Sequence, residues 1–394
     1  MSAMPRSTAD AAEGAATTST AFKDHIDAAL VARLADAFAR VDPTFPVDRF
    51  TDAALDGIAP LELKARVTHV ATALAGALPE RFADAARIVD GVLALPPDAD
   101  GHPGGLTGWD GWPLAEWVGL AGRSEPTVAL DLLSRVTRLA SGEFAIRGFI
   151  DDDPVTVLAL LDTWLDHDDE HVRRLVTEGT RPRLPWAPKL AVAASDPGYA
   201  VALLDRVVDD DSEYVRRSVS NHLNDLCRLS PELALQVATR WTERGRAAGG
   251  ETETRIDWVV RRGIRTLVKA GDPAAMRLLG HEPDLDVAVS FEVLTPQVAF
   301  GGQAEWRCTI KSLESTTHRV VVDYAIHWVR ANGSTGRKVF KWTTVDLAPG
   351  VTLTLERRHR IVPITTRTYY SGVHLVEVQL NGTVVASGEF DLSV

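Results

Sequence analysis

Hydrophobic residues recur every three or four positions along the first two thirds of the chain. Ile26, Leu30, Leu34 and Phe38 follow this spacing, and residues 63–74 repeat it. A period of 3.6 residues places such side chains on one face of an α-helix. The sequence therefore predicts helices from residue 22 onwards, and strand-like alternation is absent before residue 285.

A Val-Arg-Arg triplet marks an internal repeat in the helical region. The triplets begin at Val172, Val215 and Val260, which lie 43 and then 45 residues apart. Paired helices with a period of about 40–47 residues are typical of HEAT and armadillo repeats. We expect each triplet to open a helix that is followed by a second one, and corresponding helices to line one face of a solenoid. The repeated arginines would then form a basic stripe.

The pattern changes after residues 280–286. Seven short segments in which polar and apolar residues alternate follow, separated by turns such as Asn332-Gly333 and Asn381-Gly382. Short strands at this spacing are typical of an immunoglobulin-like sandwich. Because Cys308 has no second cysteine nearby, this sandwich lacks the disulfide of antibody domains. The predicted fold class is an α-solenoid of HEAT-like repeats followed by an all-β immunoglobulin-like sandwich.

These patterns divide the chain into three parts. Residues 1–20 are mostly Ala, Ser, Thr and Gly, and we expect a disordered tail. A helical domain at 21–283 follows, and the sandwich occupies 284–394. Within the helical domain, the Pro- and Gly-rich residues 98–107 predict an exposed loop.

Composition is that of an ordinary globular protein, with 394 residues, 45% of them hydrophobic and 24% charged. The two cysteines, Cys227 and Cys308, exclude a disulfide scaffold and fit a reducing cytoplasm. No apolar run approaches the roughly 18 residues of a transmembrane helix, and residues 1–20 lack the pattern of a signal peptide. We expect a cytoplasmic protein that does not enter a membrane.

Charge is unevenly distributed along a chain whose net charge is −12. Between residues 306 and 367, eleven Lys and Arg oppose four Asp and Glu, and residues 171–189 and 255–269 each hold five bases against one acid. Two basic surfaces on consecutive domains could hold a polyanion such as DNA or RNA. The alternative is that these arginines pair with the acidic turns of neighbouring repeats.

Several motifs carry candidate chemistry. Residues 108–122 place Trp109, Trp112 and Trp117 around Glu116 at the start of a helix, although core packing explains any one of these tryptophans. Glu143, Arg147 and Asp151 are spaced to share one helical face, which is also the spacing of an ordinary ion-pair ladder.

His167 and His171 match the H-x-x-E-H pattern of a family of zinc peptidases. A zinc site there needs both histidines on one helix. Since the intervening aspartates are typical of a turn and helix cap, we expect the two histidines on different elements and no metal site.

Further polar positions fit contacts with a phosphate backbone. Residues 179–190 form a basic segment punctuated by proline, which contains one tryptophan and is also explained as a rigid connector. Asn221, His222 and Asn224 are polar where a repeat helix is normally apolar or charged.

Seven segments of the helical domain together resemble the AlkC branch of bacterial DNA alkylation repair glycosylases. They run from "DHIDAALVARLADAF" through "LELKARVTHVATAL", "GWPLAEWVG", "EFAIRGFI", "HVRRLVTEGTRPRLPWA" and "YVRRSVSNHLNDL" to "WVVRRGIRTLVKAG", in family order, and the sandwich is similar to that of longer members. The resemblance implies a solenoid whose concave basic face binds duplex DNA. It also implies excision of cationic N3-alkylated bases, 3-methyladenine and 3-methylcytosine, without base flipping. Gly148 departs from the proline expected there, and the tail before residue 20 is atypical.

The resemblance and the residue chemistry together give a set of candidate site residues. Glu116 and Asp151 are candidates to stabilise a sugar with oxocarbenium character and to place a water, as carboxylates do in glycoside hydrolysis. Trp109, Trp112, Trp164 and Trp186 are candidates to face the cationic base. The DNA-binding candidates are Arg147, Arg173, Arg174, Arg181, Arg183, Arg216, Arg217, Asn221, His222, Arg261, Arg262, Arg337, Lys338 and Lys341.

The sequence thus favours a monofunctional DNA glycosylase that needs no cofactor or metal, works as a monomer and binds double-stranded DNA with alkylated bases. The alternative is a non-catalytic HEAT and immunoglobulin-like scaffold that binds DNA or a protein. Only the enzyme requires carboxylates and aromatic rings to converge.

Overall fold

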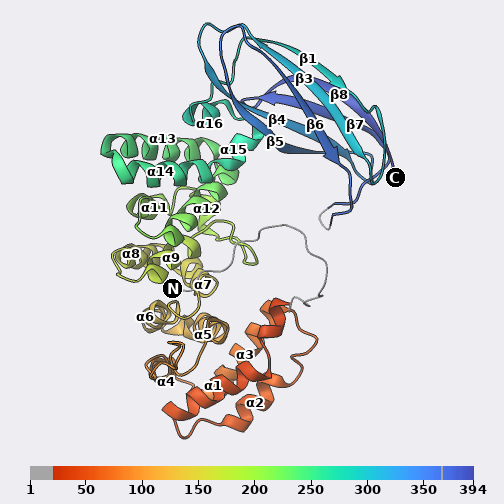
Figure 1. Ribbon diagram of the computed structural model, residues 1–394. Helices are drawn as coiled ribbons and strands as arrows, with labels where there is room; N and C mark the ends of the chain where they lie inside the picture. The colour runs from red at the N-terminus through yellow and green to blue at the C-terminus, as the bar shows by residue number, and fades with distance from the viewer. Residues whose placement is uncertain (1–20, 365–366) are drawn as a thin grey trace. The chain divides into compact units, whose positions relative to one another are not determined.

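The computed structural model describes residues 21–364 and 367–394 (Figure 1), so the tail predicted at residues 1–20 lies outside the described residues. The chain divides into two compact units, one ending at Val157 and the other comprising Leu158–Val394. The predicted boundary between helical and β domains at 283/284 falls between the last helix and the first long strand.

The first unit is helical. Its α-helices are α1 (Ala28–Val41), α2 (Val47–Leu55), α3 (Leu63–Ala77), α4 (Phe82–Leu93), α5 (Gly108–Ala121), α6 (Pro126–Val136) and α7 (Ala145–Asp152), with 3₁₀ turns η1 (Phe22–His25) and η2 (Gly122–Ser124). Helix α8 (Pro154–Trp164) continues into the second unit. The predicted periodicity is confirmed, because Leu30, Leu34 and Phe38 are fully buried on one face of α1.

The helices of the first unit pack in two rows. Helix α3 packs on α5 and α5 packs on α7, while α4 packs on α6. Gly119 allows α5 to approach α7 closely, because a Cβ there would lie 3.0 Å from the Cβ of Ala145. Residues 98–107 form a loop between α4 and α5, as predicted, but only residues 98–101 of it are exposed and Leu106 is fully buried.

The helices of the second unit also pack in pairs. Its helices are α9 (Glu170–Gly179), α10 (Val192–Ser195), α11 (Val201–Val207), α12 (Glu213–Leu229), α13 (Pro231–Ala248), α14 (Gly250–Gly263), α15 (Arg265–Ala270) and α16 (Pro273–Leu278). Helix α12 packs between α9 and α14, and α13 packs on α12 and α14. The predicted HEAT-like solenoid is confirmed.

The prediction for the triplets is confirmed for two repeats and wrong for the third. Val172 and Val215 lie in the first turns of α9 and α12, but Val260 lies near the end of α14. Helix α14 starts at Gly250, and Glu251 and Glu253 in its first turn suit the helix dipole. The third match of letters therefore does not mark an equivalent helix start.

The sandwich contains two sheets. Strands β1 (Val287–Val293), β3 (Gln303–Ser312) and β6 (Thr352–Arg360) form one sheet, in the order β1-β3-β6. The other sheet has the order β2-β8-β7-β4-β5, from strands β2 (Gln297–Ala299), β4 (His318–Val329), β5 (Thr335–Leu347), β7 (Gly372–Leu380) and β8 (Thr383–Ser393). Neighbouring strands are antiparallel, except that β2 is parallel to β8.

All seven predicted strands are confirmed, and β2 is an additional one. The alternating residues face inward, and Trp306 of β3 meets Tyr324 of β4 at 5.0 Å between the sheets. Both cysteines, Cys227 and Cys308, are buried and free, so the predicted lack of a disulfide in the sandwich is confirmed.

The sandwich contacts the last helices of the second unit through the turn between β7 and β8. Asn381 Nδ2 donates to the carbonyl of Glu282 at 2.6 Å, and Thr383 Oγ1 donates to that of Pro283 at 2.9 Å. Gly271 and Gly382 both have positive φ, and a Cβ on either would collide with the backbone of the other. Only glycine fits both positions.

Candidate DNA-binding and active site

Glu116 is held in a fixed position on α5. Thr107 and Asp110 form a capping box at the start of this helix, and the buried Asp110 also pairs with Arg33 of α1 at 2.8 Å. Two turns further on, the half-buried Glu116 accepts a hydrogen bond from Thr68 Oγ1 of α3 at 2.8 Å. The carboxylate therefore sits between two helices of the same row, with its orientation set by Thr68.

An aromatic row runs along the beginning of α5. The ring centroids of Phe22 and Trp109 lie 6.1 Å apart, those of Trp109 and Trp112 lie 6.2 Å apart, and those of Trp112 and Phe144 lie 5.9 Å apart. Trp109 and Trp112 are only half-buried, whereas Trp117 is 1% exposed. Core packing therefore explains Trp117 alone among the three tryptophans of this motif. Trp112 lies one turn before Glu116.

Two cationic or ionisable groups flank this row. The ring of His25 stacks on Trp109 with centroids 4.6 Å apart, and Lys64 Nζ lies 4.4 Å from the centre of the Phe144 ring. The ring faces thus already interact with a positively charged group at one end. The row is suited to contacts with a cationic base.

Asp151 and Arg147 lie on α7, which packs on α5. Arg147 is 4% exposed and Asp151 is exposed. The expectation that Glu143 shares a helical face with them is wrong, because α7 begins at Ala145 and Glu143 lies in the preceding turn.

The departure at Gly148 has a local cause. The guanidinium of Arg123 occupies the space where a Cβ at position 148 would lie, and it pairs with Asp152. A proline there would displace Arg123.

The two candidate tryptophans of the second unit differ in setting. Trp164 is the last residue of α8 and is half-buried. Trp186 is 67% exposed and has a φ of 64°, in the segment between α9 and α10. A non-glycine residue in the left-handed region is uncommon, and such strain concentrates at functional sites. Glu116 and Asp151 belong to the first unit.

The two histidines of the H-x-x-E-H string lie on different elements, as predicted. His167 is in the turn before α9, where its Nδ1 accepts the amide of Asp169 at 2.9 Å. His171 is on α9, and its amide donates to the Asp169 carboxylate at 2.8 Å. The H-x-x-E-H string therefore forms the start of α9.

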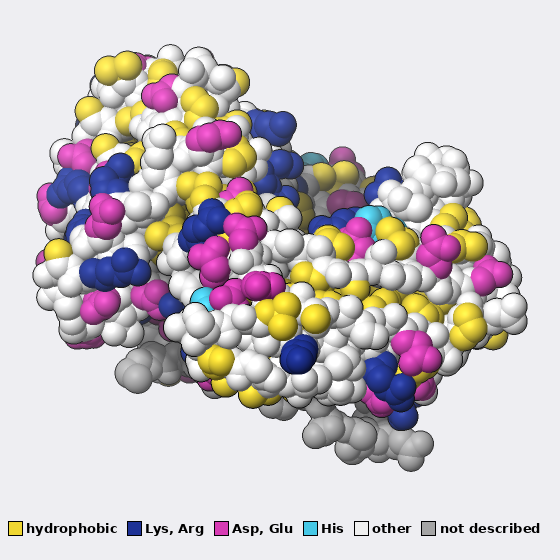
Figure 2. Space-filling view, turned by 90° about the horizontal axis from the view of Figure 1, so that it is seen from above, with side chains coloured by type: hydrophobic (Ala, Val, Ile, Leu, Met, Phe, Trp, Pro, Cys, Tyr) yellow, Lys and Arg dark blue, Asp and Glu magenta, His cyan; other side chains and the backbone are white. Residues whose placement is uncertain are grey.

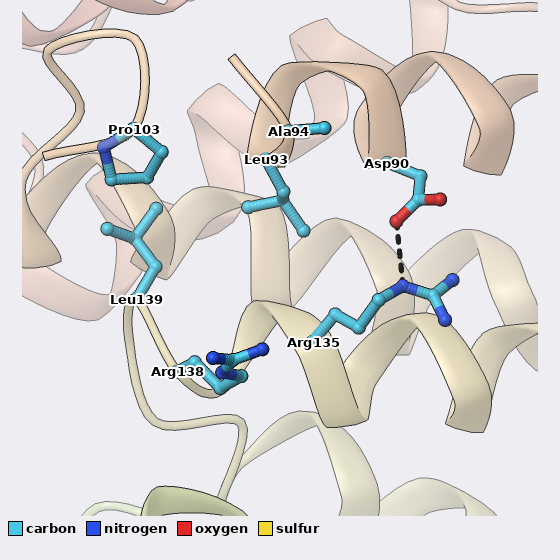
Figure 3. A pocket seen from close by; sticks show the side chains of 7 residues that line it. All are labelled: Asp90, Leu93, Ala94, Pro103, Arg135, Arg138 and Leu139. Carbon is cyan, nitrogen blue, oxygen red and sulfur yellow. Dashed lines mark ion pairs between the residues drawn. The ribbon is translucent and has the colours of Figure 1, made fainter. Parts of the chain in front are cut away.

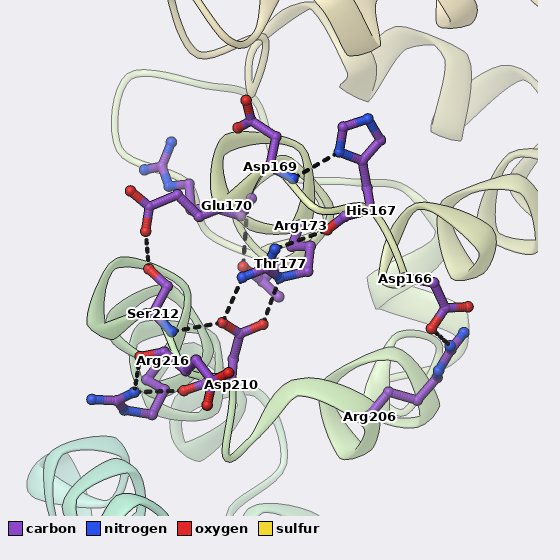
Figure 4. A network of polar contacts seen from close by, with 12 residues as sticks. Asp166, His167, Asp169, Glu170, Arg173, Thr177, Arg206, Asp210, Ser212 and Arg216 are labelled. Carbon is purple, nitrogen blue, oxygen red and sulfur yellow. Dashed lines mark hydrogen bonds and ion pairs between the residues drawn. The ribbon is translucent and has the colours of Figure 1, made fainter.

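Arg173 belongs to the contacts between repeats. Its Nε and Nη2 donate to the two carboxylate oxygens of Asp210 at 2.7 and 2.9 Å, and its Nη1 donates to the carbonyls of His167 and Asp168 (Figure 4). Arg216 makes the equivalent clasp on the carbonyls of Asp210 and Asp211. For Arg173, the pairing with a neighbouring acidic turn is thus the arrangement found.

Arg181 belongs to a buried ion-pair network. It is 8% exposed, and it donates to Glu178 at 2.6 Å and to Asp225 of α12 at 2.8 Å. Burial opposes ionisation of Glu178, but the charges of Arg174 and Arg181 outweigh it and lower the pKa of this carboxyl. Burial raises the pKa of Asp225. The guanidinium of Arg181 is therefore engaged in joining α9 to α12.

Two polar candidates on α12 also face inward. His222 is 3% exposed, with Nδ1 3.2 Å from the carbonyl of Thr177, and Asn224 donates to the carbonyl of Gly263 at 2.9 Å. They satisfy backbone groups between adjacent helices. Asn221 is half-buried and accepts from Arg265 at 3.2 Å.

The remaining repeat arginines are more accessible. Arg217 pairs with Glu213 one turn earlier, and Arg261 pairs with Asp257 at 2.6 Å. Arg262 lies over the ring of Trp258 at 5.6 Å, and Arg183 is exposed. Figure 2 shows the same mixture on the face in view, where many Lys and Arg side chains lie beside Asp or Glu.

Sequence reasoning missed the aromatic residue beside each triplet. His171 and Tyr214 directly precede the first two triplets, and their rings meet at 5.4 Å. Trp258 lies two residues before the third, and Arg265 follows it. An aromatic or histidine ring recurring at this place in successive repeats was the available signal.

The basic residues of the sandwich lie on strands at the sheet edges. Arg337 of β5 pairs with Glu377 at 3.1 Å, whereas Lys338 lies 5.6 Å from the Phe340 ring. Lys341 faces Asp323, whose pKa burial raises to about 6. Strands β5 and β6 each end a sheet, a position where lysine and arginine also discourage pairing with other chains.

A cavity of about 350 Å³ lies between α4, α6 and the 98–107 loop (Figure 3). Arg135 pairs with Asp90 across it at 2.7 Å, and the other lining residues are Leu93, Ala94, Pro103, Arg138 and Leu139. None of the candidate site residues lines this cavity.

Asp98, Asp100 and His102 on the adjoining loop bring their possible ligand atoms within 4.8 Å of one another. The Asp98 carboxylate already accepts the amides of His102 and Asp100, which lowers its pKa. This is the geometry of a turn.

Together, the fold and these side chains define a HEAT-like solenoid with an immunoglobulin-like sandwich. Carboxylates and aromatic rings lie on α5 and α7 of the first unit, and arginines lie on α9, α12 and α14 of the second. A family described as "Uncharacterised protein YhaZ, C-terminal Ig-like domain" matches residues 287–394. The uncharacterized protein YhaZ of Bacillus subtilis (strain 168) is 32% identical over 352 residues, 89% of this chain and 93% of YhaZ.

A solved structure extends the match. The alkylpurine DNA glycosylase AlkC of Pseudomonas fluorescens, bound to DNA containing an abasic site analog, is 30% identical with a TM-score of 0.83. The match covers 95% of this chain and 100% of AlkC. The chain therefore belongs to the AlkC family of HEAT-like repeat DNA glycosylases. Among the residues that the structure describes, no helix is long and apolar enough to cross a membrane.

Proposed function

We propose that the protein is a monofunctional DNA glycosylase that hydrolyses the N-glycosidic bond of cationic N3-alkylated bases, 3-methyladenine and 3-methylcytosine, in duplex DNA. Membership of the AlkC family supports the class, and the DNA-bound AlkC structure supports DNA as the partner. The observation that carries the proposal is the half-buried Glu116 carboxylate, oriented by Thr68 one turn after Trp112.

The chemistry suits a carboxylate without a general acid. When the bond between C1′ and the base nitrogen breaks, its electron pair moves to the base and neutralises the positive charge. The sugar gains oxocarbenium character, which a carboxylate stabilises, and a water attacks C1′ and gives up its proton to this carboxylate. Because the cationic base is already a good leaving group, the reaction needs no metal or cofactor.

Aromatic faces supply the preference for a charged lesion. A ring beside a cationic base contributes about 1–2 kcal/mol that a neutral base does not receive. Trp112 is placed one turn from Glu116, with Trp109 next to it. Trp164 and Trp186 stay candidates in the second unit. Recognition by ring faces fits a mechanism in which the lesion is not flipped into a pocket and no unstacking cost arises.

Asp151 is the second carboxylate in the proposal. It lies on α7, next to the helix that holds Glu116. We assign Glu116 to the sugar cation because its hydrogen bond fixes its orientation, and Asp151 to the same role if Glu116 proves dispensable. The accessible repeat arginines then contact the DNA backbone. We expect a cytoplasmic monomer.

Methylated genomic DNA tests this proposal. After incubation with the wild-type protein, mass spectrometry of the released bases should detect 3-methyladenine and 3-methylcytosine. Glu116→Gln keeps the side-chain shape but removes the charge, so release should fall by orders of magnitude while DNA affinity is kept.

Asp131→Asn is the matched control, because it removes an exposed charge from α6. It should release bases at the wild-type rate. If the wild-type protein released no base but bound DNA, the protein would be a non-catalytic scaffold. If Glu116→Gln released bases at the wild-type rate, Asp151 would take the catalytic role.

A further inference from the structure

The arginines around Trp258 differ from the others on the repeat helices. The guanidinium carbons of Arg216 and Arg262 lie 6.0 and 5.6 Å from the centre of the Trp258 ring. Arg216 comes from α12, whereas Trp258 and Arg262 come from α14. One indole ring therefore contacts two cations from adjacent repeats.

Arg265 extends this cluster. Its Nη1 donates to the carbonyl of Arg262 at 2.6 Å, and its Nη2 donates to Asn221 Oδ1 at 3.2 Å. Both partners are neutral. The half-buried guanidinium is thus held by neutral groups of α12 and α14, so its charge is not compensated by these contacts.

No carboxylate within residues 21–364 and 367–394 forms an ion pair with Arg216, Arg262 or Arg265. Glu213 feels the charges of Arg216 and Arg262, but its carboxylate pairs with Arg217. Burial lowers the pKa of Arg265 and the charge of Arg262 lowers it further, and together they outweigh the opposing charge of Asp225. The cluster consequently holds a local excess of positive charge.

In the preceding repeat, by contrast, the arginines are paired with acids. Arg173, the equivalent of Arg216, forks onto Asp210, and Arg181 pairs with Glu178 and Asp225. A guanidinium group that is paired in this way has little capacity left to bind an external anion. Arg216, Arg262 and Arg265 instead meet an indole ring or neutral acceptors.

We propose that Arg262, Arg265 and Asn221, with Arg216, form a site for a backbone phosphate of duplex DNA, and that Trp258 positions the arginines. A phosphodiester has the charge and the several acceptor oxygens that guanidinium forks bind. The indole ring restrains flexible arginines without neutralising them, so less entropy is lost when the phosphate binds. This inference rests on the proposed DNA-binding function.

Salt-dependent binding of the full-length protein to an undamaged duplex tests the site. Loss of one phosphate contact should make the slope of log K against log salt shallower by about 0.9. We expect this change for Arg262→Gln and for Arg265→Gln. Arg240→Gln removes an arginine of α13 that pairs with Asp205 of α11, and it should keep the wild-type slope.

Trp258 variants separate positioning from charge. Trp258→Leu keeps every arginine, so it should weaken binding at low salt severalfold while the slope stays within error of the wild type. Trp258→Phe should restore most of the affinity. Unchanged affinity in Trp258→Leu would overturn the positioning role.

The phosphate assignment is overturned if Arg262→Gln and Arg265→Gln fold normally and keep the wild-type slope. It is also overturned if titration with inorganic phosphate shows tight binding that Arg262→Gln abolishes while duplex binding is unchanged, since the site would then serve a free anion. Base release is measured in parallel. Wild-type release with unchanged slopes defeats this site alone, and altered slopes without any release defeat the glycosylase proposal alone.

Discussion

The two units use the same helical architecture to present different chemistry. In the first unit, the helices of one row carry Glu116 and Asp151 beside the aromatic row of Trp109 and Trp112. In the second, the corresponding row carries arginines, with Tyr214 and Trp258 beside them. The rings lie beside carboxylates in the first unit, with Lys64 at one end of the row, and beside arginines in the second. This difference suggests that the first unit performs the chemistry and the second holds the DNA.

Arginine in the second unit has two distinct uses. Arg173 and Arg181 close onto acids of a neighbouring repeat, whereas Arg262 and Arg265 do not. Counting basic residues in the sequence cannot separate these uses, because the acids lie 37 and 44 residues away from their arginines. Stability and DNA binding should therefore respond to different substitutions.

The largest stability effect should follow from opening the buried network. Glu178→Gln removes the carboxylate that Arg174 and Arg181 share, so both guanidinium groups lose a buried counter-charge. We expect a loss of about 3–5 kcal/mol in unfolding free energy, measured by urea denaturation. Glu213→Gln, which opens the exposed pair with Arg217, should cost about 1 kcal/mol or less. Equal stability of the two variants would contradict the structural role of Glu178.

A smaller effect should depend on pH and arise in the sandwich. Burial lowers the pKa of His359 to about 4, and the charges of Arg367 and Arg357 add to this. The unfolded chain binds this proton near pH 6.5 and the folded chain only near pH 4, so unfolding free energy should fall as pH drops through this window. The contribution is up to about 3 kcal/mol.

Denaturation at pH 7 and pH 4.5 checks this effect. His359→Gln keeps an acceptor for the Tyr324 hydroxyl and should flatten the pH dependence, whereas His25→Gln on the exposed η1 turn should not. A wild-type pH profile in His359→Gln would contradict the assignment.

The smallest effect should distinguish neighbouring bases of β5. If the sandwich also contacts DNA, Lys338→Gln should make the salt slope of binding shallower by about 0.9. The ammonium group of Lys338 lies over an aromatic ring, which does not neutralise its charge, so it can still bind a phosphate. Arg337→Gln should change it less, because Arg337 pairs with Glu377. Unchanged slopes in both variants would favour a sandwich that docks a protein partner.

Much of this architecture follows from local patterns. Periods of 3.6 and 2 predicted the helices and seven strands, because each period reports which side of an element is buried. Strand β2 escaped prediction because it has three residues and one buried side chain, Val298, and pairs with the distant β8. The prediction that the third triplet opens a helix was wrong, because the Val-Arg-Arg sequence recurs there although the helix starts ten residues earlier.

The candidate site was less predictable than the fold. Glu116 and its tryptophans stand out locally, since they cluster within one helix. The hydrogen bond of Glu116 to Thr68 joins residues 48 positions apart, and the Arg265–Asn221 contact joins residues 44 apart. Contacts of this kind depend on helix packing, which the sequence does not display.

The division of labour between the units can be tested on one oligonucleotide that contains 3-methyladenine. Single-turnover base release and the salt slope of binding are measured for the wild type, Glu116→Gln and the double variant Arg262→Gln/Arg265→Gln. We predict that Glu116→Gln loses release by at least about 100-fold and keeps the wild-type slope. Because both arginines serve one phosphate, the double variant should bind with a slope shallower by about 0.9 and release base at a near-normal rate once saturated. Normal release by Glu116→Gln, or lost release in the saturated double variant, would contradict the account.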